Sequence, residues 1–198
     1  IHTMPNELPD PIPFPDDELH DAYVPEHARA LMNALVQSDR VLKAFRARFT
    51  GKCSPVHFFW GSFDLAVTRF SGRAAPEHPG GIPFLPDEIT REAYSHEVSS
   101  CGFWPGNREA PEPFFYSYAY PTPEGYAEAA VEPTAAYWLT DLGEFVLPYE
   151  AVRAADSPDD AIDAFLQSTY VAAANLADWD RRNLEWEPGY RPLARRRF

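Results

Sequence analysis

TGKCSPVHFFWGSFDLAVTRFSGR, residues Thr50 to Arg73, is the stretch in which the chain concentrates its aromatic residues. From Val56 to Phe70 the residues are almost all aromatic, β-branched or small, which suits a half-buried strand and gives no helical stripe. Because side chains alternate along a strand, one face is predicted to enter the core. That face would carry His57, Phe59, Phe63, Leu65, Val67 and Arg69.

A single strand over this stretch would span about 50 Å, which is longer than most strands. Gly61 and Ser62 lie at its middle, and a glycine in a strand weakens it or marks a bulge. We therefore expect a bend at this point. A one-residue bulge there would exchange the two faces for every residue beyond it.

A second strand is predicted from Arg91 to Phe103, after a loop rich in proline and glycine. The two strands would form a hairpin with a long loop. One register pairs Phe70 with Arg91, sets Arg69 beside Glu92 and brings Asp64 near His96 and Glu97. A loop of this length leaves the register open, and an error of two residues would rearrange every pair.

Two amphipathic helices flank the strands. The first begins at Pro25, a favoured first-turn residue, and the last begins with Pro158 after the predicted N-cap Ser157. In both, apolar residues recur at spacings of three and four, which predicts one buried face. These faces hold Leu31, Leu35, Ser38, Leu42, Phe45 and Phe49 in the first helix, and Ile162, Phe165, Thr169, Ala172, Leu176 and Trp179 in the last.

Alternating aromatic residues predict further strands. Phe114, Tyr116, Tyr118 and Tyr120 would share one strand face, and a turn at Leu142-Gly143 would join Tyr137–Thr140 to Glu144–Tyr149. The fold class is therefore α+β: a mostly antiparallel sheet of about five strands, packed on one face against two long amphipathic helices.

The chain has 198 residues, of which 45% are hydrophobic and 15% aromatic, and this is enough for one domain with a substantial core. We place that domain at 25–183. Residues 1–24 form a proline-rich acidic arm whose Ile12 and Phe14 are candidates for docking on the domain, and residues 184–198 form a basic tail.

The formal net charge is −13, which repels phosphate backbones and anionic lipid. This argues against nucleic acid and membrane surfaces as partners. No apolar run is long enough for a membrane span and no signal peptide is visible, so we expect a soluble, cytoplasmic protein. Cys53 and Cys101 are predicted to be reduced thiols rather than a disulfide.

The sequence contains none of the motifs of the P-loop, dinucleotide, zinc-peptidase, EF-hand or serine-hydrolase sites. Whether the protein is an enzyme is therefore open, and we predict no cofactor and no metal site. His57, Asp64 and His96 are weak catalytic candidates. His57 is alternatively a hydrogen-bonded core residue, and the carboxylate of Asp64 requires water or a partner, for which Arg69 and Arg73 are the candidates.

A ligand pocket is the alternative use of these residues. Trp60, Tyr94 and Trp104 would line an apolar cleft, in which Asp64, Arg69 and Arg73 would hold a polar or anionic ligand. The competing interpretation places the same aromatic residues in the core.

The runs GKCSPVHFFWGSFDLAVTRFSGR, REAYSHEVSSCGFWPG and FLQSTYVAAANLADWD resemble an uncharacterised bacterial family, classed only as a domain of unknown function. The resemblance covers nearly the whole chain from PDPIPF onward and implies no activity. It implies that members carry a further N-terminal portion, so that this chain would be their C-terminal part.

Two hypotheses of function follow. In the first, this is an interaction or structural domain whose aromatic sheet face packs on its own N-terminal portion or on a second copy. In the second, it is a small-molecule binding protein or enzyme with a polar cleft around Asp64 and Arg69.

Overall fold

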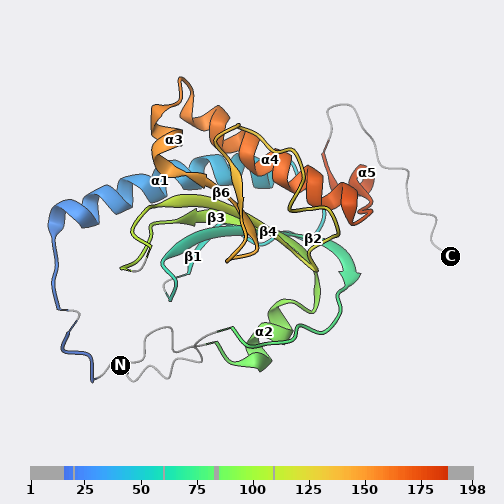
Figure 1. Ribbon diagram of the computed structural model, residues 1–198, viewed down its shortest axis with the longest axis horizontal. Coiled ribbons are helices and arrows are strands. Elements are labelled where there is room, and N and C mark those ends of the chain that lie inside the picture. The colour runs from blue at the N-terminus through green and yellow to red at the C-terminus, as the bar shows by residue number, and fades with distance from the viewer. Residues whose placement is uncertain (1–15, 20, 60, 83–84, 109, 187–198) are drawn as a thin grey trace.

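The computed structural model describes residues 16–19, 21–59, 61–82, 85–108 and 110–186. Five helices and six strands lie within these ranges (Figure 1). In chain order they are α1 (Pro25–Ala47), β1 (His57–Phe59), β2 (Asp64–Ala74), α2 (Asp87–Ala93), β3 (His96–Trp104), β4 (Phe114–Tyr120), β5 (Tyr137–Leu139), β6 (Glu144–Pro148), α3 (Tyr149–Ala154), α4 (Pro158–Leu176) and α5 (Arg181–Leu184).

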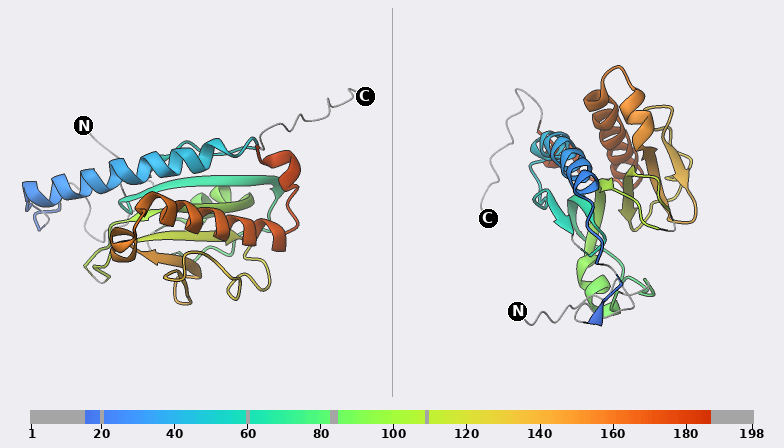
Figure 2. Two further views of the ribbon diagram at one scale, coloured as in Figure 1. Left: turned by 90° about the horizontal axis from the view of Figure 1, so that it is seen from above. Right: turned by 90° about the vertical axis from the view of Figure 1, so that its left-hand side faces the viewer.

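The strands form one sheet in the order β1-β2-β3-β4-β6-β5, and every neighbouring pair is antiparallel. Helices α1 and α4 cover one face of this sheet, whereas α2 lies on the other side (Figures 1 and 2). The α+β class and the coverage of one face by two long helices are confirmed. The described sheet has one strand more than expected, since β1 is separate from β2.

Helix α1 begins at Pro25, as predicted, and its buried residues are Ser38, Val41, Leu42 and Phe45. They follow the predicted stripe, because residues three and four apart share a helix face. On another face, Lys43 donates to Asp39 over 2.6 Å in an i,i+4 ion pair.

Helix α4 begins at Pro158 with Ser157 as its N-cap residue, but the Ser157 side chain makes no capping hydrogen bond. The buried face is displaced from the predicted one toward its C-terminal end. Tyr170, Ala173 and Ala174 are buried, whereas Leu176 is 47% exposed. The ring of Tyr170 accounts for the difference, because it packs edge-on against Phe45 of α1 and against Phe49, which follows that helix.

The predicted bend at Gly61 is a complete reversal of the chain, so the single strand from Val56 to Phe70 is wrong. Strand β1 turns at residues 61–63 and pairs back on β2, with Phe59 opposite Asp64. Phe63 adopts a φ of 61° at this turn. The reversal exchanges the faces: His57 and Phe59 lie on the face of Asp64, whereas Leu65, Val67 and Arg69 enter the core beneath the helices.

Strands β2 and β3 form the expected long-looped hairpin, but in another register. Phe70 pairs with Val98 rather than Arg91, and Arg69 pairs with Ser99 rather than Glu92. Residues 87–93, which include the start of the predicted strand, are helix α2. Asp64 therefore lies at the Trp104 end of β3, far along the strand from His96, which pairs with Ala74.

Strand β4 and the β5–β6 hairpin agree with the prediction. Tyr116 pairs with Val146 and Trp138 with Phe145, so the chain turns where Leu142 and Gly143 were expected to turn it. Phe115, Phe145 and Leu147 point into the core. Phe114, Tyr116, Tyr118 and Tyr120 share the opposite face, as predicted.

Arg69 lies in the core with 1% of its surface exposed. Its guanidinium carbon is 3.4 Å from the ring centre of Phe45, 4.2 Å from that of Tyr170 and 5.1 Å from that of Phe49. One guanidinium nitrogen donates to the Phe45 carbonyl over 2.5 Å. Burial lowers the pKa of Arg69 to about 10, so the side chain stays charged at neutral pH within an aromatic cage.

Candidate functional site

The sheet face turned away from α1 and α4, which we call the open face, carries the candidate site. Gly102 lies in its middle on β3, flanked by Ala66 on β2 and Tyr116 on β4. A side chain at residue 102 would collide with its neighbours, because a Cβ there would be 2.7 Å from the Tyr116 hydroxyl and 2.8 Å from the carbon that bears it. The glycine therefore lets the Tyr116 ring lie across β3 toward β2.

This placement of Tyr116 satisfies Asp64, which is 9% exposed. The Tyr116 hydroxyl donates to one carboxylate oxygen over 2.5 Å, and the Ser62 hydroxyl donates to the other. Asp64 has neither of the ion pairs proposed for it with Arg69 and Arg73. A buried carboxylate with two hydroxyl donors is stabilised without a cation.

Glu144, at the start of β6, is the second carboxylate of this face. It is half-buried, and burial, followed by the charge of Asp64, raises its pKa to about 7. Among the described residues it has no side-chain hydrogen bond and no ion pair. Glu144 therefore titrates near neutral pH and keeps its acceptor sites unused.

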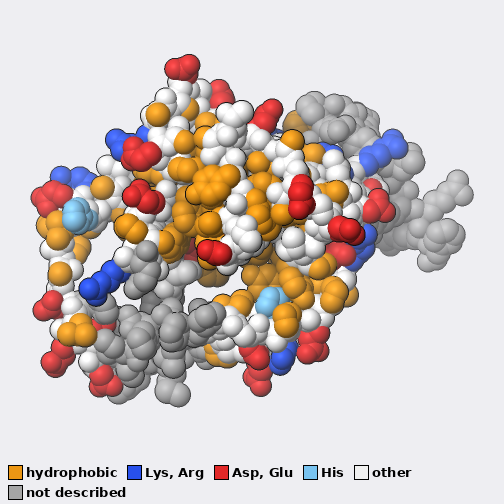
Figure 3. Space-filling model, viewed as in Figure 1, with side chains coloured by type: hydrophobic (Ala, Val, Ile, Leu, Met, Phe, Trp, Pro, Cys, Tyr) orange, Lys and Arg blue, Asp and Glu red, His pale blue; other side chains and the backbone are white. Residues whose placement is uncertain are grey.

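A pocket of about 600 Å³ opens between these two carboxylates. Its aromatic lining is Trp104, Phe114, Tyr116 and Tyr118, and the indole N–H of Trp104 donates to the Ser62 carbonyl over 3.1 Å. The remaining lining residues are Ser62, Asp64, Asn107, Ala110, Leu139, Asp141, Leu142 and Glu144. Figure 3 shows hydrophobic side chains gathered around the place of β4 and β6, with the visible Lys and Arg side chains toward the edges.

A row of phenols continues from the pocket toward α2. The rings of Tyr116 and Tyr118 stack at 6.2 Å, and the Tyr118 hydroxyl lies 3.0 Å from that of Tyr94. His78 in turn stacks on Tyr94 at 4.9 Å. Burial is the main cause that raises the pKa of all three tyrosines, so they are neutral hydrogen-bonding groups at physiological pH.

Among the residues predicted for a site, the structure brings Asp64 and Trp104 together in this pocket, while Tyr94 lies beyond Tyr118. Trp60 lies outside the described residues. His57 is exposed on β1, where its ring contacts Phe59. His96 is exposed at the far end of β3, so the three catalytic candidates His57, Asp64 and His96 do not converge.

Neither predicted arginine reaches the pocket. Arg69 lies on the helix-covered face, so the expected cleft around Asp64 and Arg69 is not formed. Arg73 binds Glu97 over 2.8 Å and donates to the carbonyls of Ala177 and Asp178 after α4. The predicted cleft is wrong because Asp64 and Arg69 are an odd number of positions apart along β2, so their side chains lie on opposite faces of the sheet.

The sequence analysis missed Glu144, Asp141 and the loop residues Asn107 and Ala110 as lining residues. The alternation along β4 had already placed Phe114, Tyr116 and Tyr118 on one face, and the hairpin at Leu142-Gly143 had already been expected. No local pattern, however, indicates that β6 pairs with β4 and carries Glu144 toward Asp64.

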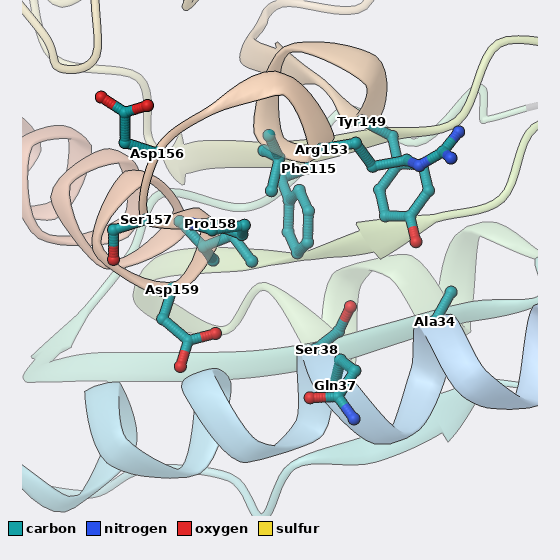
Figure 4. A pocket seen from close by; sticks show the side chains of 12 residues that line it. Ala34, Gln37, Ser38, Phe115, Tyr149, Arg153, Asp156, Ser157, Pro158 and Asp159 are labelled. Carbon is teal, nitrogen blue, oxygen red and sulfur yellow. The ribbon is translucent and has the colours of Figure 1, made fainter.

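A second pocket, of about 560 Å³, lies on the helix side between α1, α3 and α4 (Figure 4). Two of its three charged side chains are already paired: Arg153 binds Glu150 over 2.8 Å, and Asp159 binds Arg40. Gln37 accepts a further bond from Arg40. This pocket therefore offers fewer free polar groups than the one on the open face.

Metal binding has little support in the described part of the chain, where no group of three or more His, Cys, Asp or Glu residues could hold a metal ion. Cys53 and Cys101 are free thiols, as predicted, and burial raises the pKa of both. Cys101 lies in the core on the helix side, and Cys53 forms an isolated backbone bridge with Arg69 of β2. Neither cysteine lines the open-face pocket.

A sequence comparison matches residues 1–186 to a family described as a family of unknown function (DUF5996). The chain belongs to this family. The predicted membership is thereby confirmed, whereas an N-terminal portion preceding the chain stays a prediction, because the match does not describe residues 1–186 as a C-terminal part of DUF5996. No curated protein and no solved structure matches the chain. Within the described residues, no helix is both long and apolar enough to cross a membrane.

Proposed function

We propose that this member of DUF5996 binds a small molecule in the pocket between Asp64 and Glu144. The observation that carries the proposal is the combination of an aromatic lining with a carboxylate, Glu144, that is half-buried and has no partner among the described side chains. Small-molecule sites of roughly 300–1,000 Å³ combine apolar walls with a few polar groups in this way.

The construction of the pocket supports the proposal. Each wall comes from a different segment: Asp64 from β2, Trp104 from β3, Tyr116 from β4 and Glu144 from β6. A sheet holds such side chains rigidly, since every strand is paired on its neighbours. The hydrogen bond from the Tyr116 hydroxyl to Asp64 further limits the motion of these two lining side chains.

A fragment screen read by NMR would test the proposal. The indole N–H of Trp104 lies at the pocket and is a direct reporter, and Trp104→Phe assigns its signal. We expect bound fragments to shift this signal in the wild type and to lose affinity in Ala110→Phe, which narrows the pocket without removing a polar group. If no fragment shifts the Trp104 signal, the proposal fails.

Association through exposed aromatic residues is a second candidate function. Phe58, Phe59 and Phe63 surround the β1–β2 turn and are 37%, 48% and 50% exposed. Strand β1 is also an edge of the sheet, where unpaired backbone groups can bind another chain. The partner, as expected from the sequence, is a second copy or an N-terminal portion of the same protein.

Sedimentation at several concentrations would test this second candidate. Self-association should weaken in Phe59→Ser, whereas Leu142→Ser, a matched change of an exposed apolar residue on the β5–β6 turn, should leave it unchanged. A wild type that stays monomeric throughout excludes the second copy as partner. A bacterial origin and a cytoplasmic location remain part of the proposal; the first rests on the family resemblance of the sequence, and the free thiols support the second.

A further inference from the structure

We infer that the ligand of the open-face pocket is an organic cation, whose charged nitrogen faces Glu144 and Asp64 and whose apolar part packs on the aromatic lining. This inference rests on the proposed function, because it names the class of molecule that the same pocket would take.

The charges of the lining favour a cation. Asp64, Asp141 and Glu144 line the pocket, and the described residues of its lining include no Lys, Arg or His. An anion would meet repulsion from three carboxyl groups with no basic side chain to offset it. The predicted use of Arg69 and Arg73 for an anionic ligand is therefore replaced by the opposite charge preference.

The hydrogen-bonding capacity of the two inner carboxylates also favours a donor-rich ligand. An ionised carboxylate has about four acceptor positions, and an ammonium group offers three donors and no acceptor. Asp64 receives one hydrogen bond from Tyr116 and one from Ser62, which leaves acceptor positions open. Glu144 receives none from the described side chains.

The aromatic side chains add a third contribution. A cation within about 6 Å of an aromatic ring centre is attracted to the face of that ring. The protein already holds one cation in this way, since Arg69 lies among Phe45, Phe49 and Tyr170 and has no carboxylate partner in the part of the chain that the structure describes. Trp104, Phe114 and Tyr118 provide rings beside the two carboxylates of the pocket.

Three probes with the same phenyl group separate charge from shape: 2-phenylethylammonium, 2-phenylethanol and 3-phenylpropionate. Binding is followed by the indole signal of Trp104. We expect the ammonium to bind, the alcohol to bind at least roughly tenfold more weakly, and the carboxylate to give no shift. In Glu144→Gln the ammonium should lose roughly tenfold in affinity, while the alcohol is unaffected.

The net charge of −13 attracts any cation, so a matched control is needed. Asp156→Asn changes the net charge as Glu144→Gln does, but residue 156 lines the pocket on the helix side. It should leave the affinity for the ammonium unchanged. Asp141→Asn, on the exposed β5–β6 turn, is a second variant whose folding is not at risk, and it should weaken the ammonium several-fold.

The outcomes separate a failure of the cation inference from a failure of the ligand site. Equal binding of the alcohol and the ammonium, or equal weakening by Asp156→Asn and Glu144→Gln, overturns the cation inference while the ligand site stands. If neither these probes nor any fragment of the wider screen shifts the Trp104 signal, the ligand site itself is wrong.

Discussion

On the open face, the candidate site depends on a single residue without a side chain, Gly102. Gly102 has an ordinary backbone conformation, so its value lies in the space that it leaves. That space holds the Tyr116 ring, and the ring carries the hydroxyl that satisfies Asp64. The absence of a side chain at Gly102 thus allows the carboxylate of Asp64 to be buried with a hydrogen-bond donor.

Gly102→Ala should therefore destabilise the protein. The added Cβ would collide with the end of the Tyr116 side chain and with the Leu65 carbonyl, so we expect the free energy of unfolding to fall by about 1–3 kcal/mol. Urea denaturation measures this. Ser100→Ala, on the same strand and face, removes a hydroxyl that bonds Thr68 and Tyr118, and it should cost about 1 kcal/mol. Equal effects of the two changes would contradict the account.

The raised pKa of Glu144 predicts that the stability of the protein depends on pH. Its folded pKa of about 7 is raised from the ordinary value of 4.5, so between these values the folded protein holds a proton that the unfolded chain releases. The contribution of Glu144 to stability is therefore present below pH 4.5 and is lost as the pH rises toward 7.

Urea denaturation at pH 5, 6, 7 and 8 checks this prediction. The wild type should lose stability relative to Glu144→Gln as the pH rises, because the amide does not ionise. Glu150→Gln, an exposed change on α3, should follow the wild type. Parallel curves for the wild type and Glu144→Gln would show that this carboxyl does not have a raised pKa.

Among the elements, the β1–β2 hairpin has the most unusual turn. Phe63 has a φ of 61°, a conformation that costs a non-glycine residue roughly 1–2 kcal/mol. Its ring is 50% exposed and contacts Phe58 edge-on. The backbone conformation of Phe63, beside the pocket residues Ser62 and Asp64, is therefore expected to lower the stability of the hairpin.

Phe63→Asn should accordingly stabilise the protein, by about 1 kcal/mol, because asparagine tolerates the left-handed conformation. Thermal or urea denaturation measures the gain. Phe59→Asn, an exposed aromatic change in the paired part of β1, should bring no gain. A loss of stability in Phe63→Asn would mean that the contact with Phe58 outweighs the backbone cost.

The whole molecule has one closed face and one open face. On the closed face, ion pairs from Arg40 to Asp159 and from Arg48 to Asp163 join the rims of α1 and α4. Beneath them, Arg69 of β2 contacts both helices through the aromatic cage. The open face has the pocket instead, so stability and ligand binding are assigned to opposite sides of one sheet.

Substitutions of Arg69 test the cage. Arg69→Met keeps most of the volume and removes a buried charge, so it should be more stable than Arg69→Ala by about 2 kcal/mol, as a cavity costs that much or more. Arg69→Lys keeps the charge but loses the flat guanidinium, and it should be less stable than Arg69→Met. Urea denaturation gives all three values. A lysine variant as stable as the wild type would show that charge alone suffices.

The sequence by itself determined the two long helices, strand β4, the β5–β6 hairpin and the buried faces of α1 and β4. The stripe of α1, the alternation along β4 and the turn at Leu142-Gly143 are local patterns, because burial of one side repeats with the period of the helix or strand. These patterns were enough for the α+β class and for the aromatic face that lines the pocket.

Only the tertiary structure decided which residues meet. The chain reverses at the turn that contains Phe63 in the left-handed conformation, and this puts His57 and Phe59 on the face of Asp64, whereas a continuous strand would have put them in the core. The pairing of β6 with β4, which brings Glu144 toward Asp64, joins segments far apart in the chain. Such pairings depend on the packing of the entire sheet, and a local pattern contains no information on a distant partner.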